Sequence, residues 1–262
     1  MIDLTESEVR ITTACILAAG TGSRLQPLTD CQPKCLTEIH GLSILERLVA
    51  SLRTQGFTRL VFVVGHLEAC IRDSLELHAR DMTIEFVSNP VFATTNNLYS
   101  LWLARHYINE PFLLIESDLI FDAPLLDGLS YPDRIAVSNR LPWMNGTTVN
   151  MTASQRVSKF CLSEFSGATE ERFKTVNICS FSAASWRTVV ARLDQFVAAG
   201  RVTEYYEAVF EELVAEGSLD FLGVMFDENR WYEVDTIDDL RNAHVMFANA
   251  VTEAPALSHD DS

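Results

Sequence analysis

A short apolar run that ends in a glycine loop constrains the fold of this chain more than any other feature. The run from Thr12 to Ala19 ends in ACILAA, and Gly20 and Gly22 follow directly. Apolar residues at consecutive positions, without alternation, are typical of a strand in a parallel sheet that is covered on both faces. The glycines lack Cβ atoms, so backbone N–H groups of the loop can approach a polyphosphate. We therefore expect an α/β fold with an anion-binding loop at a strand end.

Strand and helix patterns then alternate through the first half of the chain. Leucines and valines recur at helical spacing from Leu42 to Leu52, and Gly56 is expected to end that helix. A second buried strand at Leu60–Val64 completes a βαβ unit, whose crossover is right-handed. Further strands are expected at 83–87 and 112–115, and a helix at 98–107. Acidic residues directly after the strand at 112–115 would lie at the carboxyl edge of the sheet, where open α/β sheets bind ligands.

The second half has shorter strands and longer helices. We expect strands near 134–138, 147–151, 175–181 and 221–226, and helices near 185–199, 203–216 and 237–248. Neither an internal repeat nor a low-complexity linker divides the chain. The sequence therefore predicts one domain over residues 1–252, followed by a disordered tail at 253–262.

Charge and composition exclude several classes of protein. The formal net charge is -16, which argues against broad nucleic-acid binding, because such binding needs a basic surface. No apolar run approaches the roughly 20 residues that a membrane span needs. The six cysteines are scattered, and Cys31 and Cys35 lack a second pair at zinc-site spacing. We expect a cytoplasmic protein without a nucleic-acid or membrane partner.

Two cations on the glycine loop supply the local positive charge that an anionic ligand requires. Arg24 follows the glycines, and Lys34 lies ten residues later behind Pro33. An arginine fork matches phosphate oxygens, and a lysine supplies a mobile point charge. The loop lacks the G-x-x-x-x-G-K-[ST] spacing of a P-loop and the third glycine of G-x-G-x-x-G. A P-loop NTPase and a dehydrogenase are therefore not favoured.

The whole segment LAAGTGSRLQPLTDCQPKCL, from Leu17 to Leu36, closely resembles the opening of the nucleotidyltransferases that make CDP-, dTDP-, UDP- and GDP-activated metabolites. The resemblance implies a single-domain, three-layer, Rossmann-like α/β/α fold with a mixed, mostly parallel central sheet. It implies a nucleotide-binding half at about 11–130 and an acceptor-binding half at about 131–252. Arg24 would hold the departing phosphates, and Lys34 would bridge the reacting phosphates of nucleotide and acceptor. The residues implied to bind the nucleotide here are Leu17, Ala18, Ala19, Gly20, Thr21, Gly22, Ser23 and Arg24.

Two aspartates fit the same family as metal ligands. Asp118 follows the strand at 112–115, and Asp235 ends the segment WYEVD. The resemblance implies that this pair holds Mg²⁺ or Mn²⁺ between the nucleotide and the acceptor, and Mg²⁺ commonly takes one or two carboxylates beside phosphates and water. Glu116 and Glu233 either contact and orient these metal ligands or are solvated charges. An acceptor phosphate or phosphonate is already anionic, so the reaction needs cations and positioning rather than a catalytic histidine or serine.

The choice of nucleotide follows from a further segment. Residues from Asn89 to Leu101 are similar to those of choline-phosphate cytidylyltransferases and their 2-aminoethylphosphonate relatives, which implies CTP. Amide and hydroxyl groups would read the polar edge of cytosine, although Asn96 and Asn97 also suit a helix N-cap. His66 is either part of the base pocket or a polar pocket wall. The further residues predicted to bind the nucleotide are Gly65, Asn89, Asn97 and Ser100.

The sequence restricts the identity of the acceptor less than that of the nucleotide. Lys174 stands where related enzymes place a lysine that contacts the acceptor phosphate, and its alternative is a surface position at a strand start. Trp143 and Tyr232, with the neighbouring Trp231, suggest an aromatic wall for an ammonium group, and Glu233 is the remaining candidate for substrate binding. Phosphocholine and 2-aminoethylphosphonate fit this description.

Alternatives remain for the function as a whole. A sugar-1-phosphate nucleotidyltransferase that uses dTTP, UTP or GTP shares the same loop. A nucleotide-sensing module that retained the fold without catalysis, or an interaction scaffold, would belong to another class. The organic part of the acceptor, the pathway and the oligomeric state, including a homodimer, stay open.

Overall fold

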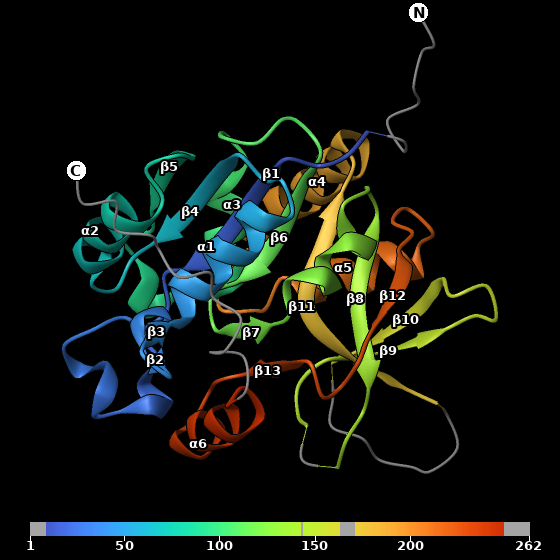
Figure 1. Cartoon of the computed structure of the whole chain (residues 1–262). Coiled ribbons are helices and arrows are strands. Elements are labelled where there is room, and N and C mark those ends of the chain that lie inside the picture. The colour runs from blue at the N-terminus through green and yellow to red at the C-terminus, as the bar shows by residue number, and fades with distance from the viewer. Residues whose placement is uncertain (1–8, 143, 163–170, 249–262) are drawn as a thin grey trace, which may run out of the picture.

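The computed structural model describes residues 9–142, 144–162 and 171–248 (Figure 1). Its first half is a parallel sheet in the order β6-β1-β4-β5. The four strands are β1 (Thr13–Ala18), β4 (Arg59–Val64), β5 (Thr83–Ser88) and β6 (Phe112–Glu116). Their carboxyl ends share one edge, as expected for parallel strands.

The second half of the chain extends the same sheet. The long strand β11 (Phe173–Phe181) runs antiparallel to β6 and also pairs with β8 (Arg134–Asn139) and β9 (Thr148–Met151). β10 (Val157–Cys161) pairs with β9, and β12 (Leu222–Phe226) pairs in parallel with β8. Within the described residues the sheet has nine strands, of which β10 and β11 run opposite to the others. The predicted mixed, mostly parallel sheet is confirmed.

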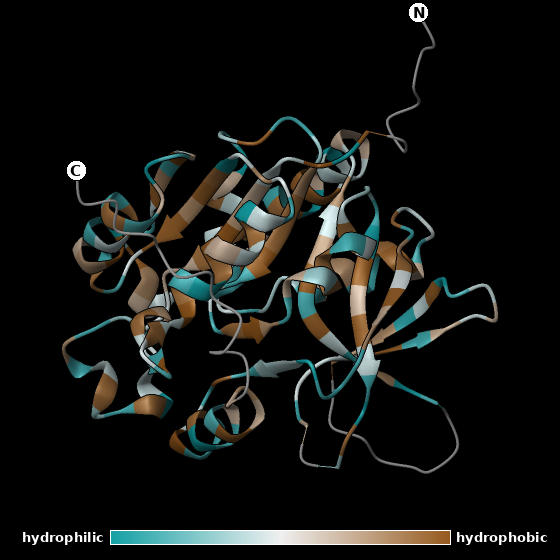
Figure 2. Cartoon of the chain, in the orientation of Figure 1, coloured by the Kyte–Doolittle hydropathy of each residue, from teal (hydrophilic) through white to brown (hydrophobic). Residues whose placement is uncertain are grey.

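Helices cover both faces of this sheet. Residues of β1 alternate between two apolar clusters: Ala14 and Ile16 face one side, and Cys15 and Leu17 face the other. This two-sided burial is the reason why β1 is apolar at consecutive positions. The first cluster is completed by α1 (Ile44–Thr54) and α2 (Glu68–His78), and the second by α3 (Asn97–Ala104), α4 (Ala183–Ala198) and α5 (Glu207–Ala215). Apolar colour follows the central strands in Figure 2.

Two small two-stranded sheets accompany the main sheet. β2 (Glu38–Ile39) and β3 (Leu42–Ser43) form a hairpin in front of α1, and Ser43 caps that helix in a capping box with Glu46. β7 (Leu119–Phe121) pairs antiparallel with β13 (Trp231–Glu233), after which α6 (Ile237–Met246) packs on a third apolar cluster. The pairing of β7 with β13 brings the segment that contains Asp235 back to the end of β6.

Several local predictions differ from the structure. The pattern from Leu42 belongs first to β3, so α1 begins at Ile44, and α5 begins at Glu207 rather than 203. The loop after β1 contains short 3-10 turns at η2 (Ser23–Leu25), η3 (Leu28–Asp30) and η4 (Lys34–Leu36). The helix α2 and the strands β7 and β10 were not predicted. The tail at 253–262 lies outside the described residues.

In the part of the chain that the structure describes, no helix combines the length and the apolar character of a transmembrane segment.

Candidate active site

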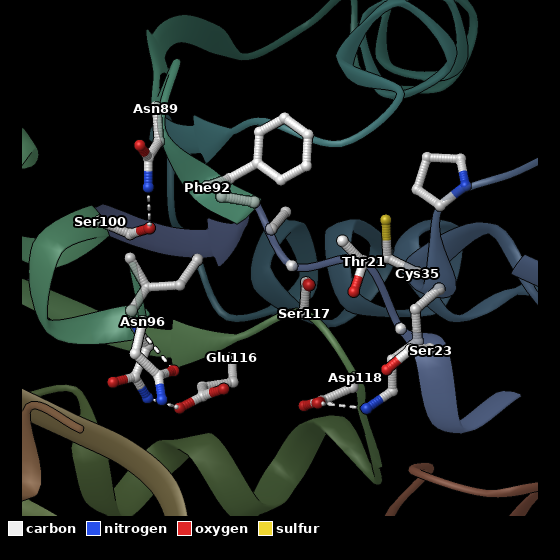
Figure 3. Close-up of a pocket in the computed structure, with 18 of the residues that line it drawn as sticks. Thr21, Ser23, Cys35, Asn89, Phe92, Asn96, Ser100, Glu116, Ser117 and Asp118 are labelled. Atoms are coloured by element: carbon white, nitrogen blue, oxygen red, sulfur yellow. Dashed lines mark hydrogen bonds and ion pairs between the residues drawn. The ribbon is translucent and has the colours of Figure 1, made fainter. Parts of the chain in front are cut away.

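A cavity of about 440 Å³ opens at the carboxyl edge of the parallel strands (Figure 3). The loop after β1 forms one wall, the segment after β5 and the start of α3 form another, and the residues after β6 form the floor. The cavity is lined by all eight residues of the predicted nucleotide loop, Leu17 to Arg24, and by Lys34, Asn89, Asn97, Ser100, Glu116, Asp118 and Asp235. The fold therefore gathers most of the predicted residues from five separate segments.

One glycine of the loop, Gly22, is required for steric reasons. Gly22 has a φ of 62°, in the left-handed region, and a Cβ there would lie 2.9 Å from the Cβ of Lys34. Its carbonyl accepts a hydrogen bond from the Thr29 hydroxyl at 2.9 Å, which fixes the turn. Gly65 does not line the cavity: a Cβ there would lie 2.9 Å from Phe92 Cβ, so this glycine permits close packing behind the loop.

Lys34 joins the loop to both predicted metal ligands. Its Nζ donates to Asp118 Oδ2 at 2.7 Å and to Asp235 Oδ1 at 2.6 Å, and Arg24 Nη2 donates to the same Asp235 oxygen at 2.7 Å. Burial by itself lowers the pKa of Lys34, but Asp118 and Asp235 more than offset this effect and raise it above its usual range. Lys34 therefore stays charged at neutral pH.

The β7–β13 pair positions the two aspartates. Asp118 lies between β6 and β7, Asp235 follows β13, and Val234 N donates to Asp118 O at 3.0 Å. The side chains of Asp118, Glu233 and Asp235 each offer an oxygen, and these oxygens all lie within 4.8 Å of one another. Asp118 Oδ1 is buried without a hydrogen-bond partner in the described residues. Clustered carboxylate oxygens, one of them unpaired, suit a hard divalent cation such as Mg²⁺.

Further acids are buried beside this cluster. Burial, together with the nearby charges of Asp118, Glu207 and Glu233, raises the pKa of Glu116 well above its usual value. Burial also raises the pKa of Glu233, although Lys174 opposes the shift, and it raises that of Glu207 to about 7. Sequence reasoning missed Glu207, because a glutamate at a helix start is ordinary in sequence and only the fold reveals its burial.

The predicted base-pocket residues lie at the far end of the cavity. Asn89 Nδ2 donates to Ser100 Oγ at 3.1 Å, and both residues are buried. Asn97 Nδ2 donates to Glu116 Oε1 at 2.9 Å, while its Oδ1 accepts from Tyr206 N at 3.0 Å. Asn97 therefore ties α3 to β6 and to the start of α5.

Asn96 and His66, the other two residues considered for this end of the cavity, differ in what they contact. Asn96 caps α3 as the sequence suggested, because its side chain accepts from Asn97 N. The His66 ring lies beside Phe92, with ring centroids 5.8 Å apart, and does not line the cavity.

A second, smaller cavity of about 30 Å³ adjoins the carboxylates. Lys174, Trp231, Glu233 and Asp235 are among its lining residues. Lys174 is buried rather than a surface lysine: its Nζ donates to Thr175 O at 2.6 Å and lies 3.5 Å from Glu233 Oε2.

The predicted aromatic wall is only partly present at this cavity. Tyr232 lines neither cavity, because alternate residues of β13 face opposite sides and Tyr232 packs in the third apolar cluster with Leu25 and Ile39. This placement does not favour its predicted contact with the acceptor. The adjacent Trp231 does line the cavity, and its Nε1 is buried with no partner in the described residues. Trp143 lies outside the described residues.

Comparisons with known proteins fit this geometry. Residues 14–131 match the model of the MobA-like NTP transferase domain. The first half of the chain is therefore similar to this family's domain. It is 30% identical over 245 residues to CMP-5'-(3-aminopropyl)phosphonate synthase of Streptomyces rubellomurinus, covering 90% of this chain but only 38% of that relative. It is 22% identical over 237 residues to choline-phosphate cytidylyltransferase of Streptococcus pneumoniae, covering 90% of this chain and 98% of that one.

Two solved nucleotidyltransferase structures share the fold. CTP:phosphocholine cytidylyltransferase from Streptococcus pneumoniae superimposes with a TM-score of 0.77 at 22% identity, over 91% of this chain and 100% of the other. The inositol-1-phosphate CTP transferase from T. maritima also gives a TM-score of 0.77, at 19% identity, over 94% of this chain and 98% of the other. The predicted fold is therefore confirmed, and the family match over residues 14–131 agrees with the predicted resemblance.

Proposed function

We propose that this chain transfers the cytidylyl group of CTP to a small phosphorylated or phosphonylated acceptor and releases pyrophosphate. The observation that carries the proposal is that Lys34 lies between the glycine loop and the carboxylates Asp118 and Asp235. One cavity thus combines a loop open to a triphosphate, two cations and an acidic cluster. The names of the relatives support a cytidylyltransferase and a phosphate or phosphonate acceptor.

The reaction needs little beyond charge compensation and alignment. An oxygen of the acceptor forms a bond to the α-phosphorus of CTP, the bond from that phosphorus to the β-phosphate oxygen breaks, and pyrophosphate carries away the electron pair. The loop N–H groups and Arg24 lie along the wall where the β- and γ-phosphates would bind. Lys34, which stays charged, lies where it can reduce the repulsion between the two anions as they approach.

Asp118, Asp235 and Glu233 are the residues that would hold a divalent cation here, since their oxygens converge and Asp118 Oδ1 is unpaired. Such a cation would supply charge neutralisation at the transferring phosphoryl group. Lys34 contacts both Asp118 and Asp235, and Arg24 contacts Asp235. Anionic phosphates attract both side chains, so we propose that a triphosphate draws them from the carboxylates and frees those oxygens for the metal.

The acceptor would enter on the side of the small cavity. Lys174 is the buried cation on that side, and Trp231 Nε1 is a donor in need of a partner. Both groups suit oxygens of a phosphate or phosphonate. Glu233 and Glu207 are placed to balance the charge of Lys174.

A pyrophosphate-release screen tests the function. CTP, UTP, dTTP and GTP are each supplied with Mg²⁺ or Mn²⁺ and with phosphocholine, 2-aminoethylphosphonate, 3-aminopropylphosphonate, inositol phosphate or glucose 1-phosphate. We expect turnover with CTP and at least one of the phosphonates or phosphocholine, abolished in Asp118→Asn. Asp220→Asn, at an exposed position, is the matched control and should retain activity. Turnover with glucose 1-phosphate and UTP or dTTP instead would contradict the proposal.

A further inference from the structure

Asn89 and Ser100 form a polar pair at the base end of the main cavity whose hydrogen-bond directions can be assigned. They are 2% and 4% exposed, and both line the cavity. Asn89 Oδ1 accepts from the backbone N–H of Val91 at 3.0 Å. A backbone N–H is always a donor, so this contact identifies which end of the carboxamide is the oxygen.

The amide nitrogen of Asn89 is then fully engaged as a donor. Its two hydrogens point to Thr95 Oγ1 at 3.2 Å and to Ser100 Oγ at 3.1 Å. Thr95 donates its own hydrogen to Val91 O at 3.0 Å, so its oxygen is available as an acceptor. Asn89 therefore uses both donors and an oxygen lone pair within the protein, and it is not free to read a base without breaking these bonds.

Ser100 differs from Asn89, because its donor group is not engaged by the described residues. Its Oγ receives the hydrogen of Asn89, so its own hydroxyl hydrogen points elsewhere, and among the described residues the structure records no acceptor for it. Figure 3 shows the two side chains joined across the upper part of the cavity. A buried hydroxyl hydrogen that is kept away from Asn89 and has no protein partner favours a ligand that offers an acceptor.

We infer that Ser100 is the group that distinguishes cytosine from uracil and thymine, and that Asn89 is a positioning residue that orients the Ser100 hydroxyl. N3 of cytosine is an acceptor, whereas N3 of uracil and of thymine carries a hydrogen and is a donor. A hydroxyl held as a donor forms a hydrogen bond with the first and meets a second donor in the others. This inference rests on the proposed function and extends it to the origin of CTP preference.

The variant Asn89→Asp reverses the pair with a minimal change of shape. Its Oδ1 still accepts from Val91 N, but the atom that replaces Nδ2 is an acceptor, so Ser100 donates to it and turns lone pairs to the cavity. We expect the ratio of kcat/KM for CTP to that for UTP to fall by about 10- to 100-fold, which is the scale of one hydrogen bond exchanged for an unpaired buried group. The Kd ratio of the two nucleotides should move in the same direction.

Three further variants separate specificity from damage to the fold. Ser100→Ala should lower the CTP-to-UTP ratio, and Asn89→Asp added to it should change the ratio no further. Thr95→Val removes the other acceptor of Asn89 and should keep the wild-type ratio, whatever it does to the rate. Thermal denaturation of each variant verifies folding, and Ser100→Ala carries the test if Asn89→Asp does not fold.

The outcomes for this inference and for the proposed function are distinct. If wild-type protein turns over CTP but Ser100→Ala and Asn89→Asp keep its CTP-to-UTP ratio, Ser100 does not face N3 and the inference is overturned. If the wild-type protein turns over no nucleotide, the proposed function fails. The Kd ratios of the same variants then still decide whether Ser100 selects the base.

Discussion

Glu207, the first residue of α5, allows the electrostatics beside the carboxylate cluster to be tested quantitatively. It is 7% exposed, and burial raises its pKa from 4.5 to about 7 against the lowering effects of a backbone hydrogen bond and of Lys174. In the unfolded chain the same group ionises near 4.5, so the unfolded state loses its proton first as the pH rises. The free energy of unfolding therefore falls between pH 4.5 and pH 7, by about 3 kcal/mol at about 1.4 kcal/mol per pKa unit.

Glu207→Gln removes this dependence, because glutamine stays neutral in both states. Urea unfolding from pH 4 to pH 9 compares the variant with the wild type and with Glu76→Gln, a matched substitution at an exposed position of α2. We expect the stability of Glu207→Gln relative to wild type to increase by about 3 kcal/mol from pH 4.5 to pH 7 and to stay level above that. If the difference in unfolding free energy between Glu207→Gln and the wild type does not vary with pH, the reasoning is refuted, whatever the absolute size of that difference.

Two further predictions concern the nucleotide loop. Lys34→Met should reduce the rate of pyrophosphate release by at least about 100-fold, since it removes a charge from the reacting phosphates. The same variant should bind Mn²⁺ more tightly without nucleotide, measured by titration calorimetry, because Lys34 no longer contacts Asp118 and Asp235; the exposed Lys159→Met should behave as wild type in both assays. Gly22→Ala should lower the free energy of unfolding by about 1–3 kcal/mol, measured in urea. The alanine would have a positive φ, and its Cβ would lie 2.9 Å from the Cβ of Lys34. Equal losses in Gly22→Ala and Gly20→Ala, where the added methyl meets open space, would contradict that cause.

The glycine loop and the strand ends were predictable because they depend on local sequence. A buried strand, two glycines and two cations within a single segment predict an anion-binding loop, and carboxylates after a strand fall at the sheet edge in any parallel fold. The roles of Lys34, Asp118 and Asp235 were predicted from the resemblance of these segments to nucleotidyltransferases, and the structure brings all three residues together.

The acceptor side was predicted less well because it depends on contacts between distant segments. Tyr232 and Trp231 are neighbours in the sequence, but the register of β13 with β7 decides which of them faces the cavity. Glu207 reaches the carboxylate cluster only through the packing of α5 on the sheet. The positioning role that we infer for Asn89 depends on distant contacts too, because its carboxamide is engaged by Val91, Thr95 and Ser100, which no sequence spacing reveals.

The most direct test of the central claim follows the α-phosphorus of CTP. The protein is incubated with CTP labelled at the α-phosphate, Mg²⁺ and the acceptor that gives the most pyrophosphate, and the products are separated and examined by ³¹P NMR. The account predicts that the label appears in a phosphoanhydride with the acceptor, with one pyrophosphate formed for each labelled product. Label found only in CMP or CDP, or release of inorganic phosphate in place of pyrophosphate, would contradict transfer of the cytidylyl group.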